Sequence, residues 1–133
     1  RFLWLIRHGE SIGNVARQKA EKIRSKIIET PCREPDVELS ENGVVQCERL
    51  GKWFASQTEK PTIVYSSPYL RAQISTQILL NNAKLDLEIR NDERLREREF
   101  GVFDTLTKDG ATEKFPELCE LRERWGKFYF RPP

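Results

Sequence analysis

The sequence predicts an α/β fold with a mostly parallel sheet, because it twice passes from a short apolar run through a turn into a helical pattern. Residues 2–6 are five consecutive apolar residues, too few for a helix of three turns and typical of a strand buried on both faces of a parallel sheet. Residues 61–65 form a second, β-branched run, which Ser66-Ser67-Pro68 ends before a helix opens. Ligands bind beyond the carboxyl ends of such strands, so we expect the functional site there.

Length and composition describe one globular domain without a strong charge signal. The 133 residues are 38% hydrophobic and 33% charged, and 23 basic residues against 21 acidic ones leave a net charge of +2. This balance gives no case for nucleic-acid binding through bulk electrostatics, and no apolar run approaches the length of a membrane span. The chain starts at Arg1 and contains no Met, so we expect the natural N-terminus to lie outside this sequence.

The cysteines Cys32, Cys47 and Cys119 are odd in number and widely spaced, and no Cys-x-x-Cys pattern joins them. This usage favours reduced thiols in an intracellular, cytoplasmic protein and argues against a zinc site. The sequence also lacks a Gly-x-x-x-x-Gly-Lys-Ser/Thr run, which excludes a P-loop.

The first apolar run stops at Arg7-His8-Gly9, which contains the only histidine of the chain. An imidazole with a pKa near neutrality can act as an unprotonated nucleophile, while a permanently charged guanidinium beside it holds the phosphoryl group or carboxylate under attack. Gly9 allows close approach of the backbone. The alternative is that His8 is a core histidine and Arg7 a surface cation.

A helix is predicted to start at Ser11 and to continue to about Ala20, because Ser11 can cap a run of good helix formers. The amino-terminal end of this helix then points at His8 and offers backbone N–H groups to an anion. Ser11 and Asn14 can add donors to that anion site, or they can serve the helix as caps alone.

Two prolines in residues 30–36 predict a loop, and Ser40 is a good N-cap for a helix that follows to about Gln57. The apolar residues of this helix keep the three-to-four residue spacing of one buried face, so we assign the helix to packing. They are Val44, Cys47, Leu50 and Phe54, with Trp53 beside them.

Arg71 falls in the first turn of the helix that follows residues 61–65. Its side chain can reach the crevice that His8 faces if the two strands are neighbours. A second guanidinium would complete a clamp, because planar bidentate donors stabilise the charge of a transferring phosphoryl group better than lysine does. Leu70, Ile74 and Ile78 are predicted to form the core stripe of this helix.

Two further elements follow. Residues 85–89 alternate strictly between apolar and charged and predict an edge strand with one wet face, and the charged residues 91–101 after them have the composition of a solvated loop. Residues 117–130 predict an amphipathic helix that covers the site as a lid or packs nearby. Its apolar positions at helical spacing are Leu118, Leu121, Trp125 and Phe128.

Three segments carry a more specific signal: Arg7-His8-Gly9-Glu10-Ser11 with Asn14, Ser66-Ser67-Pro68-Tyr69-Leu70-Arg71-Ala72 with Thr76, and Leu95-x-Glu97 with Gly101. Together they resemble the histidine phosphatase superfamily, which includes phosphoglycerate mutases, fructose-2,6-bisphosphatases and many broad phosphatases. The resemblance implies a three-layer α/β/α fold with a mostly parallel sheet, phosphoglycerate mutase-like and incomplete in this chain. Residues 1–133 would then be the N-terminal part of a single histidine phosphatase domain.

The resemblance also implies roles for individual residues. His8 would be phosphorylated during turnover, and Glu97 would be the general acid that protonates the leaving oxygen, with Glu99 as its competitor by proximity. The implied catalytic residues are Arg7, His8, Arg71 and Glu97, and the candidate substrate-binding residues are Arg7, Ser11, Asn14, Arg71 and Arg98.

The implied activity is hydrolysis of a small phosphomonoester, with no metal or other cofactor and no nucleic-acid or membrane partner. A phosphoglycerate mutase that uses the same phosphohistidine is the alternative, although mutases of this family usually carry an aromatic hydroxyl where this chain has Phe100. The family's second His-Gly is absent from the sequence, which keeps open a catalytically inactive protein that binds phosphorylated ligands. The oligomeric state, a homodimer included, also stays open.

Overall fold

The structure is a computed structural model that describes residues 2–133 and groups them into two compact units. The first, here called the His8 unit, contains the residues up to Val15 together with Cys32–Glu97, and the second, the C-terminal unit, contains Ala16–Pro31 and Arg98–Pro133. The elements in chain order are α1 (Ile12–Lys22), the 3₁₀ turn η1 (Glu34–Asp36), α2 (Glu41–Ser56), β1 (Val64–Ser66), α3 (Leu70–Ala83), β2 (Ile89–Asn91), the 3₁₀ turns η2 (Glu93–Leu95) and η3 (Gly101–Phe103), α4 (Lys108–Lys114) and α5 (Pro116–Tyr129).

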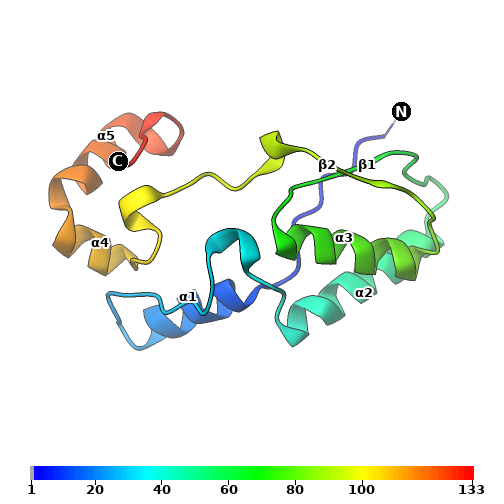
Figure 1. The fold of residues 1–133 in the computed structure, drawn as a ribbon, viewed down its shortest axis with the longest axis horizontal. Helices are drawn as coiled ribbons and strands as arrows, with labels where there is room; N and C mark the ends of the chain where they lie inside the picture. The colour runs from blue at the N-terminus through cyan, green and yellow to red at the C-terminus, as the bar shows by residue number, and fades with distance from the viewer. Residues whose placement is uncertain (1) are drawn as a thin grey trace. The chain divides into compact units, whose positions relative to one another are not determined.

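The sheet of the His8 unit consists of β1 and β2, which run parallel with Val64 opposite Ile89 (Figure 1). The α/β class and the parallel pairing are therefore as predicted. The predicted strand at residues 85–89 begins to pair only at Ile89. The predicted alternation of buried and exposed side chains is nevertheless present, because Leu85 and Leu87 pack against the core while the charged residues between and after them are exposed.

Residues 2–6 do not form the buried strand that the sequence predicts, and this prediction is wrong for this structure. Phe2, Leu3 and Leu5 are 69%, 83% and 88% exposed. A strand is buried on both faces only when neighbouring strands and covering layers surround it, and no strand among residues 2–133 pairs with this segment. Trp4 is the member that packs, edge-on against Trp53 and Phe54.

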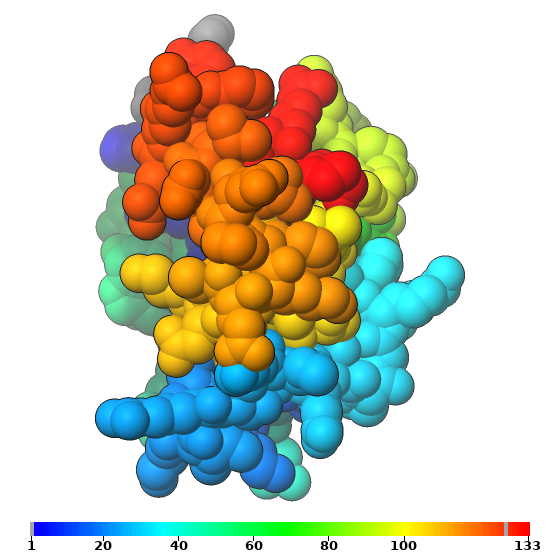
Figure 2. Space-filling model, turned by 90° about the vertical axis from the view of Figure 1, so that its left-hand side faces the viewer, coloured from blue at the N-terminus to red at the C-terminus, as the bar shows by residue number. Residues whose placement is uncertain are grey.

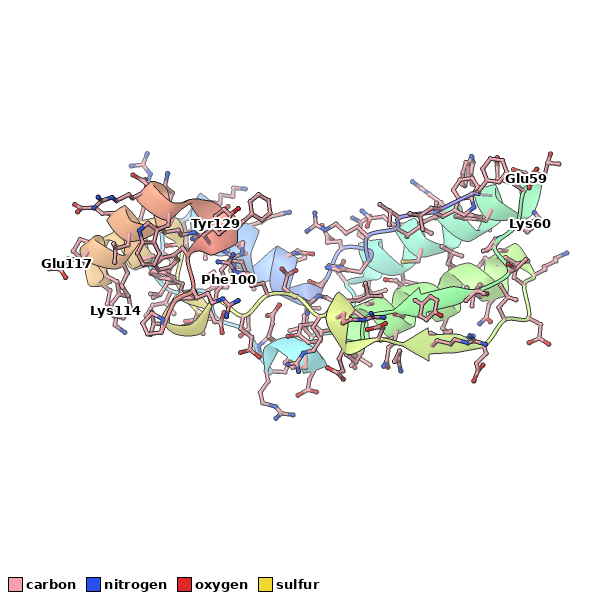
Figure 3. All side chains as sticks on the ribbon, turned by 90° about the horizontal axis from the view of Figure 1, so that it is seen from above. Glu59, Lys60, Phe100, Lys114, Glu117 and Tyr129 are labelled. Carbon is pink, nitrogen blue, oxygen red and sulfur yellow. The ribbon has the colours of Figure 1, made fainter. Side chains whose placement is uncertain are left out.

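α2 begins where the sequence predicts, because the Ser40 side chain accepts a hydrogen bond from the Gly43 N–H at 3.0 Å. At the other end, the ammonium of Lys60, labelled in Figure 3, donates to the carbonyls of Phe54 and Ala55 in the last turn of the helix, at 2.5 and 2.6 Å. Cys47 and Phe54 of the predicted stripe are buried, so the packing role of α2 is confirmed.

α3 lies beside α2 (Figure 1), and the face that it buries is not the predicted one. Leu70 and Ile74 are only half-buried and line a shallow hollow with Ile89. The buried positions instead begin with Arg71 and Ser75, and continue with Leu79, Leu80 and Ala83. The apolar half of this face forms the core with Phe54, while its polar half carries the side chains described below.

The C-terminal unit has its own core of Phe103, Leu106, Ala111 and Phe130. Residues 25–28 are bonded to residues 105–107, through Ile28 N–H to Thr105 O at 2.8 Å among others, and Figure 2 shows the first segment in blue directly beside α4 in orange. Among residues 2–133 no helix is long and apolar enough to cross a membrane.

The predicted apolar stripe of α5 is right for its first half only. Leu118 and Leu121 pack on the core of the C-terminal unit, whereas Trp125 and Phe128 are 54% and 79% exposed. Gly126, whose φ of 74° interrupts the helix, turns Phe128 off the stripe. Trp125 precedes this interruption, so the glycine does not explain its exposure. The lid role of this helix stays a prediction.

Candidate active site

The loop after residue 6 is held tightly on the start of α2. The Ile12 N–H donates to the Glu38 carbonyl at 3.0 Å, and the Ser40 N–H donates to the Glu10 carbonyl at 2.9 Å. Gly43 is required by this contact, because a Cβ at that position would overlap the backbone of Glu10. The loop that carries His8 is therefore fixed by backbone contacts on a helix end.

The Glu10 carboxylate belongs to this anchor. Its Oε1 accepts hydrogen bonds from Ser40 Oγ at 2.6 Å and from Asn42 Nδ2 at 3.3 Å, and the Glu10 N–H donates to Gln46 Oε1 at 2.8 Å. A carboxylate at the first turn of α2 is also favoured by the helix dipole. The acidic residue two positions after His8 is thus used for positioning, and the sequence reasoning gave it no role.

Ser75 links the loop to α3 and was also missed from the sequence. Its hydroxyl accepts a hydrogen bond from the Gly9 N–H at 3.0 Å and donates to the Arg71 carbonyl at 2.7 Å, and the residue is 6% exposed. The available signal was spacing, since a residue four positions after Arg71 lies on the same face of a helix.

Hydrogen bonds to its two ring nitrogens fix the tautomer of His8. Nδ1 lies 2.6 Å from the Gly9 carbonyl oxygen, which can only accept, so Nδ1 carries the proton. Nε2 accepts a hydrogen bond from Arg71 Nε at 3.3 Å. The unprotonated nitrogen is therefore Nε2, whose electron pair faces the guanidinium of Arg71.

The pKa of His8 is lowered from its ordinary value of 6.5. Burial is the largest cause, since it disfavours the charged imidazolium, and the positive charges of Arg71 and Arg7 lower the pKa further. The hydrogen bond to the Gly9 carbonyl and the negative charge of Glu97 oppose this shift. The imidazole is therefore neutral at pH 7, which is the state that a nucleophile needs.

The lowered pKa of His8 predicts where kcat/KM falls on the acidic side of its pH profile. Protonation of Nε2 removes the nucleophilic electron pair, so the acidic limb of kcat/KM should be centred below pH 6.5, at the lowered pKa of His8 in the free enzyme. The measurement is kcat/KM for a phosphomonoester of the full-length protein between pH 4.5 and 8, corrected for ionisation of the substrate. An acidic limb centred above pH 6.5 would contradict the assignment.

Arg71 is the buried cation of the site, at 5% exposure. Besides Nε, which faces His8, its Nη1 donates to the Glu34 carbonyl at 2.8 Å and its Nη2 pairs with Glu34 Oε1 at 2.9 Å. The ring of Tyr69 lies 4.8 Å from the guanidinium carbon. The structure thus brings together His8 and Arg71, which are 63 positions apart in the sequence.

Arg7 and Glu97 are exposed members of the same unit. Both are close enough to act on the charge of His8, Arg7 by lowering its pKa and Glu97 by raising it. Their predicted roles as phosphoryl clamp and general acid stay predictions.

The remaining candidates are engaged in local structure. Ser11 Oγ accepts from the Asn14 N–H at 3.1 Å and Asn14 Oδ1 accepts from the Ser11 N–H at 3.0 Å, so the two residues cap α1 reciprocally. Arg98 lies in the C-terminal unit, where its Nη2 donates to the Phe130 carbonyl at 2.5 Å. Contact of these three with a substrate stays a prediction.

Within the described residues, no group of three His, Cys, Asp or Glu is placed to hold a metal ion.

Comparison with known proteins gives one family. Residues 3–133 match the model of the histidine phosphatase superfamily (branch 1). A 2,3-bisphosphoglycerate-dependent phosphoglycerate mutase of Methylorubrum populi is 32% identical over 134 aligned positions, which cover all of this chain and 57% of the relative. The chain thus spans little more than half the length of the curated relatives it matches.

Solved structures are also similar to the chain, two phosphatases among them. A mycobacterial glucosyl-3-phosphoglycerate phosphatase is 26% identical with a TM-score of 0.61, and the match covers 89% of this chain and 47% of the other. A phosphoserine phosphatase from Entamoeba histolytica, solved in complex with 3-phosphoglyceric acid, is 25% identical with a TM-score of 0.62, covering 95% of this chain and 53% of the other. The fold expected from the sequence motifs is therefore confirmed.

Proposed function

Because the chain belongs to the histidine phosphatase superfamily, we propose that the full-length protein transfers the phosphoryl group of a small phosphomonoester to His8 and then to water. The observation that carries this proposal is the geometry at His8. Its Nδ1 is held by the Gly9 carbonyl at 2.6 Å, and its Nε2 lies 3.3 Å from Arg71 Nε. A neutral imidazole nitrogen is thereby presented next to a cation that can stabilise phosphoryl oxygens.

In the first step, the electron pair of His8 Nε2 attacks phosphorus and the bond between phosphorus and the ester oxygen breaks. The ester oxygen leaves with that bonding pair and takes a proton from Glu97, since an alkoxide is a poor leaving group. Arg71 and Arg7 stabilise the oxygens of the transferring group. In the second step, the Glu97 carboxylate takes a proton from water, and the water oxygen attacks phosphorus. The bond between phosphorus and Nε2 breaks and its electron pair returns to His8, so inorganic phosphate is released and both His8 and Glu97 regain their starting states.

A mutase is the second candidate, and the 32% identity to proteins named phosphoglycerate mutase favours it. It would return the phosphoryl group from His8 to another hydroxyl of the substrate instead of to water. Incubation of the full-length protein with 3-phosphoglycerate and its bisphosphate, and separately with a generic phosphomonoester, distinguishes the two. Release of inorganic phosphate at a rate well above formation of 2-phosphoglycerate supports the phosphatase, and the reverse supports the mutase.

Replacement of Glu97 by glutamine tests the proposed acid. We expect kcat for an alkyl phosphate to fall about 10²- to 10⁴-fold, because glutamine cannot donate the proton. The loss should be much smaller for p-nitrophenyl phosphate, whose leaving group needs no proton. The measurement is the ratio of the two kcat values in the wild-type protein and the variant.

Glu99→Gln is the matched control, since it removes the same charge two residues away. It should leave that ratio unchanged. An equal loss on both esters in Glu97→Gln, or a leaving-group dependence that appears in Glu99→Gln instead, would remove Glu97 from the acid role.

A further inference from the structure

Glu34 holds the guanidinium of Arg71 with two different groups. Its backbone carbonyl accepts from Nη1 at 2.8 Å, and its carboxylate pairs with Nη2 at 2.9 Å. The Arg71 side chain is 6% exposed, whereas the Glu34 side chain is 53% exposed. A partly exposed carboxylate is therefore paired with a buried guanidinium.

The Glu34 carboxylate is bound to the same guanidinium that the proposed reaction uses to hold the phosphoryl group. Arg71 Nε already faces His8, so a phosphoryl group placed on His8 Nε2 must meet the guanidinium beside the Glu34 carboxylate. Two anions at one cation repel each other, and burial of Arg71 limits the screening of that repulsion by water.

We infer that Glu34 is an internal competitor for the anion site, whose carboxylate leaves Arg71 when a phosphoryl group binds. This inference rests on the proposed function of the same site. The exposed side chain can rotate into water, while the backbone carbonyl of Glu34 continues to hold Nη1 and keeps the guanidinium in place. Glu34 thereby sets the affinity for the phosphoryl group without touching the nucleophile.

The inference predicts a specific split in the kinetics. Glu34→Gln removes the negative charge and retains the size and the backbone carbonyl, so anion affinity should rise while the geometry of His8 and Arg71 is unchanged. KM for a phosphomonoester should fall about tenfold and kcat should change little. A residue that merely supported Arg71 would give the opposite result, with weaker binding and a lower kcat.

The experiment is a titration of the full-length protein with inorganic phosphate by isothermal titration calorimetry, for the wild-type protein, Glu34→Gln and Glu38→Gln. Glu38 is an exposed glutamate in the same connection between α1 and α2, so its variant controls for general loss of negative charge. We expect phosphate to bind about tenfold tighter to Glu34→Gln than to the other two.

Equal or weaker phosphate binding by Glu34→Gln would overturn the inference, and so would an equal gain in Glu38→Gln. In these cases the proposed function stands as long as the wild-type protein binds phosphate and hydrolyses a phosphomonoester. If the wild-type protein does neither, the proposed function fails and the inference fails with it.

Discussion

Replacing His8 by alanine is expected to abolish phosphoryl transfer, with a loss in kcat of at least about 10³-fold. His8 supplies the only imidazole of the chain, and its Nε2 is the nitrogen whose electron pair is free of a proton. Arg7 and Arg71 are permanently charged, and the Ser75 hydroxyl is bonded to two backbone groups, so none of these three offers a comparable nucleophile. The measurement is kcat for a phosphomonoester under saturating substrate.

The variant should still bind inorganic phosphate, because Arg71 keeps its contacts to Glu34 and its place on α3. Phosphate binding therefore serves as the control that the site is folded. Retention of substantial turnover by a variant that also binds phosphate would show that the chemistry does not pass through His8.

Arg71→Lys is expected to lower kcat/KM by about 10²- to 10³-fold, although the charge is kept. The guanidinium makes three separate contacts, from Nε to His8 Nε2 and from both terminal nitrogens to Glu34. An ammonium is a point charge and cannot hold these partners while it also binds a phosphoryl oxygen. Removal of the charge altogether would leave Glu34 without its partner and would mix effects on folding with effects on the reaction.

Arg49→Lys is the matched control, since Arg49 is an exposed arginine on α2 of the same unit. Both variants should unfold at a similar temperature, while only Arg71→Lys loses kcat/KM. If Arg71→Lys keeps its activity, a positive charge alone suffices at that position, and the bidentate clamp is not part of the mechanism.

The site residues that the sequence could predict are those that follow the two short apolar runs, at the turn into the next helix. His8 follows the first apolar run and Arg71 opens the helix after the second, and the expectation that they approach each other agrees with the 3.3 Å hydrogen bond between their side chains. Ser40 was predictable for a local reason, since a capping serine needs only its own first turn.

Glu34 and Ser75 were not predictable in the same way. Glu34 lies in a loop that the sequence marks only by prolines, and its contact to Arg71 depends on where that loop crosses α3. Ser75 lies one helical turn after Arg71 on the buried face of α3. The sequence predicts the buried stripe one position earlier, at Leu70, Ile74 and Ile78. Periodicity locates a buried face only when that face is apolar, and here its first half buries an arginine and a serine.

The exposure of residues 2–6 has a different cause. Their composition is that of a buried strand, but burial depends on partners that periodicity does not supply, and none of the described strands pairs with them. These residues nevertheless lead directly into the loop that carries His8, as the sequence predicts, and that loop is held on α2 through Glu10.

The phosphoenzyme itself is the direct test. The full-length protein is mixed with a phosphomonoester, quenched within milliseconds in alkali, in which phosphoramidates survive, and analysed by peptide mass spectrometry and ³¹P NMR. With Nδ1 held by the Gly9 carbonyl, the account predicts one phosphoryl group on His8, bonded to Nε2. A phosphoryl group on Nδ1 or on another residue, or turnover without any phosphoenzyme, would contradict it.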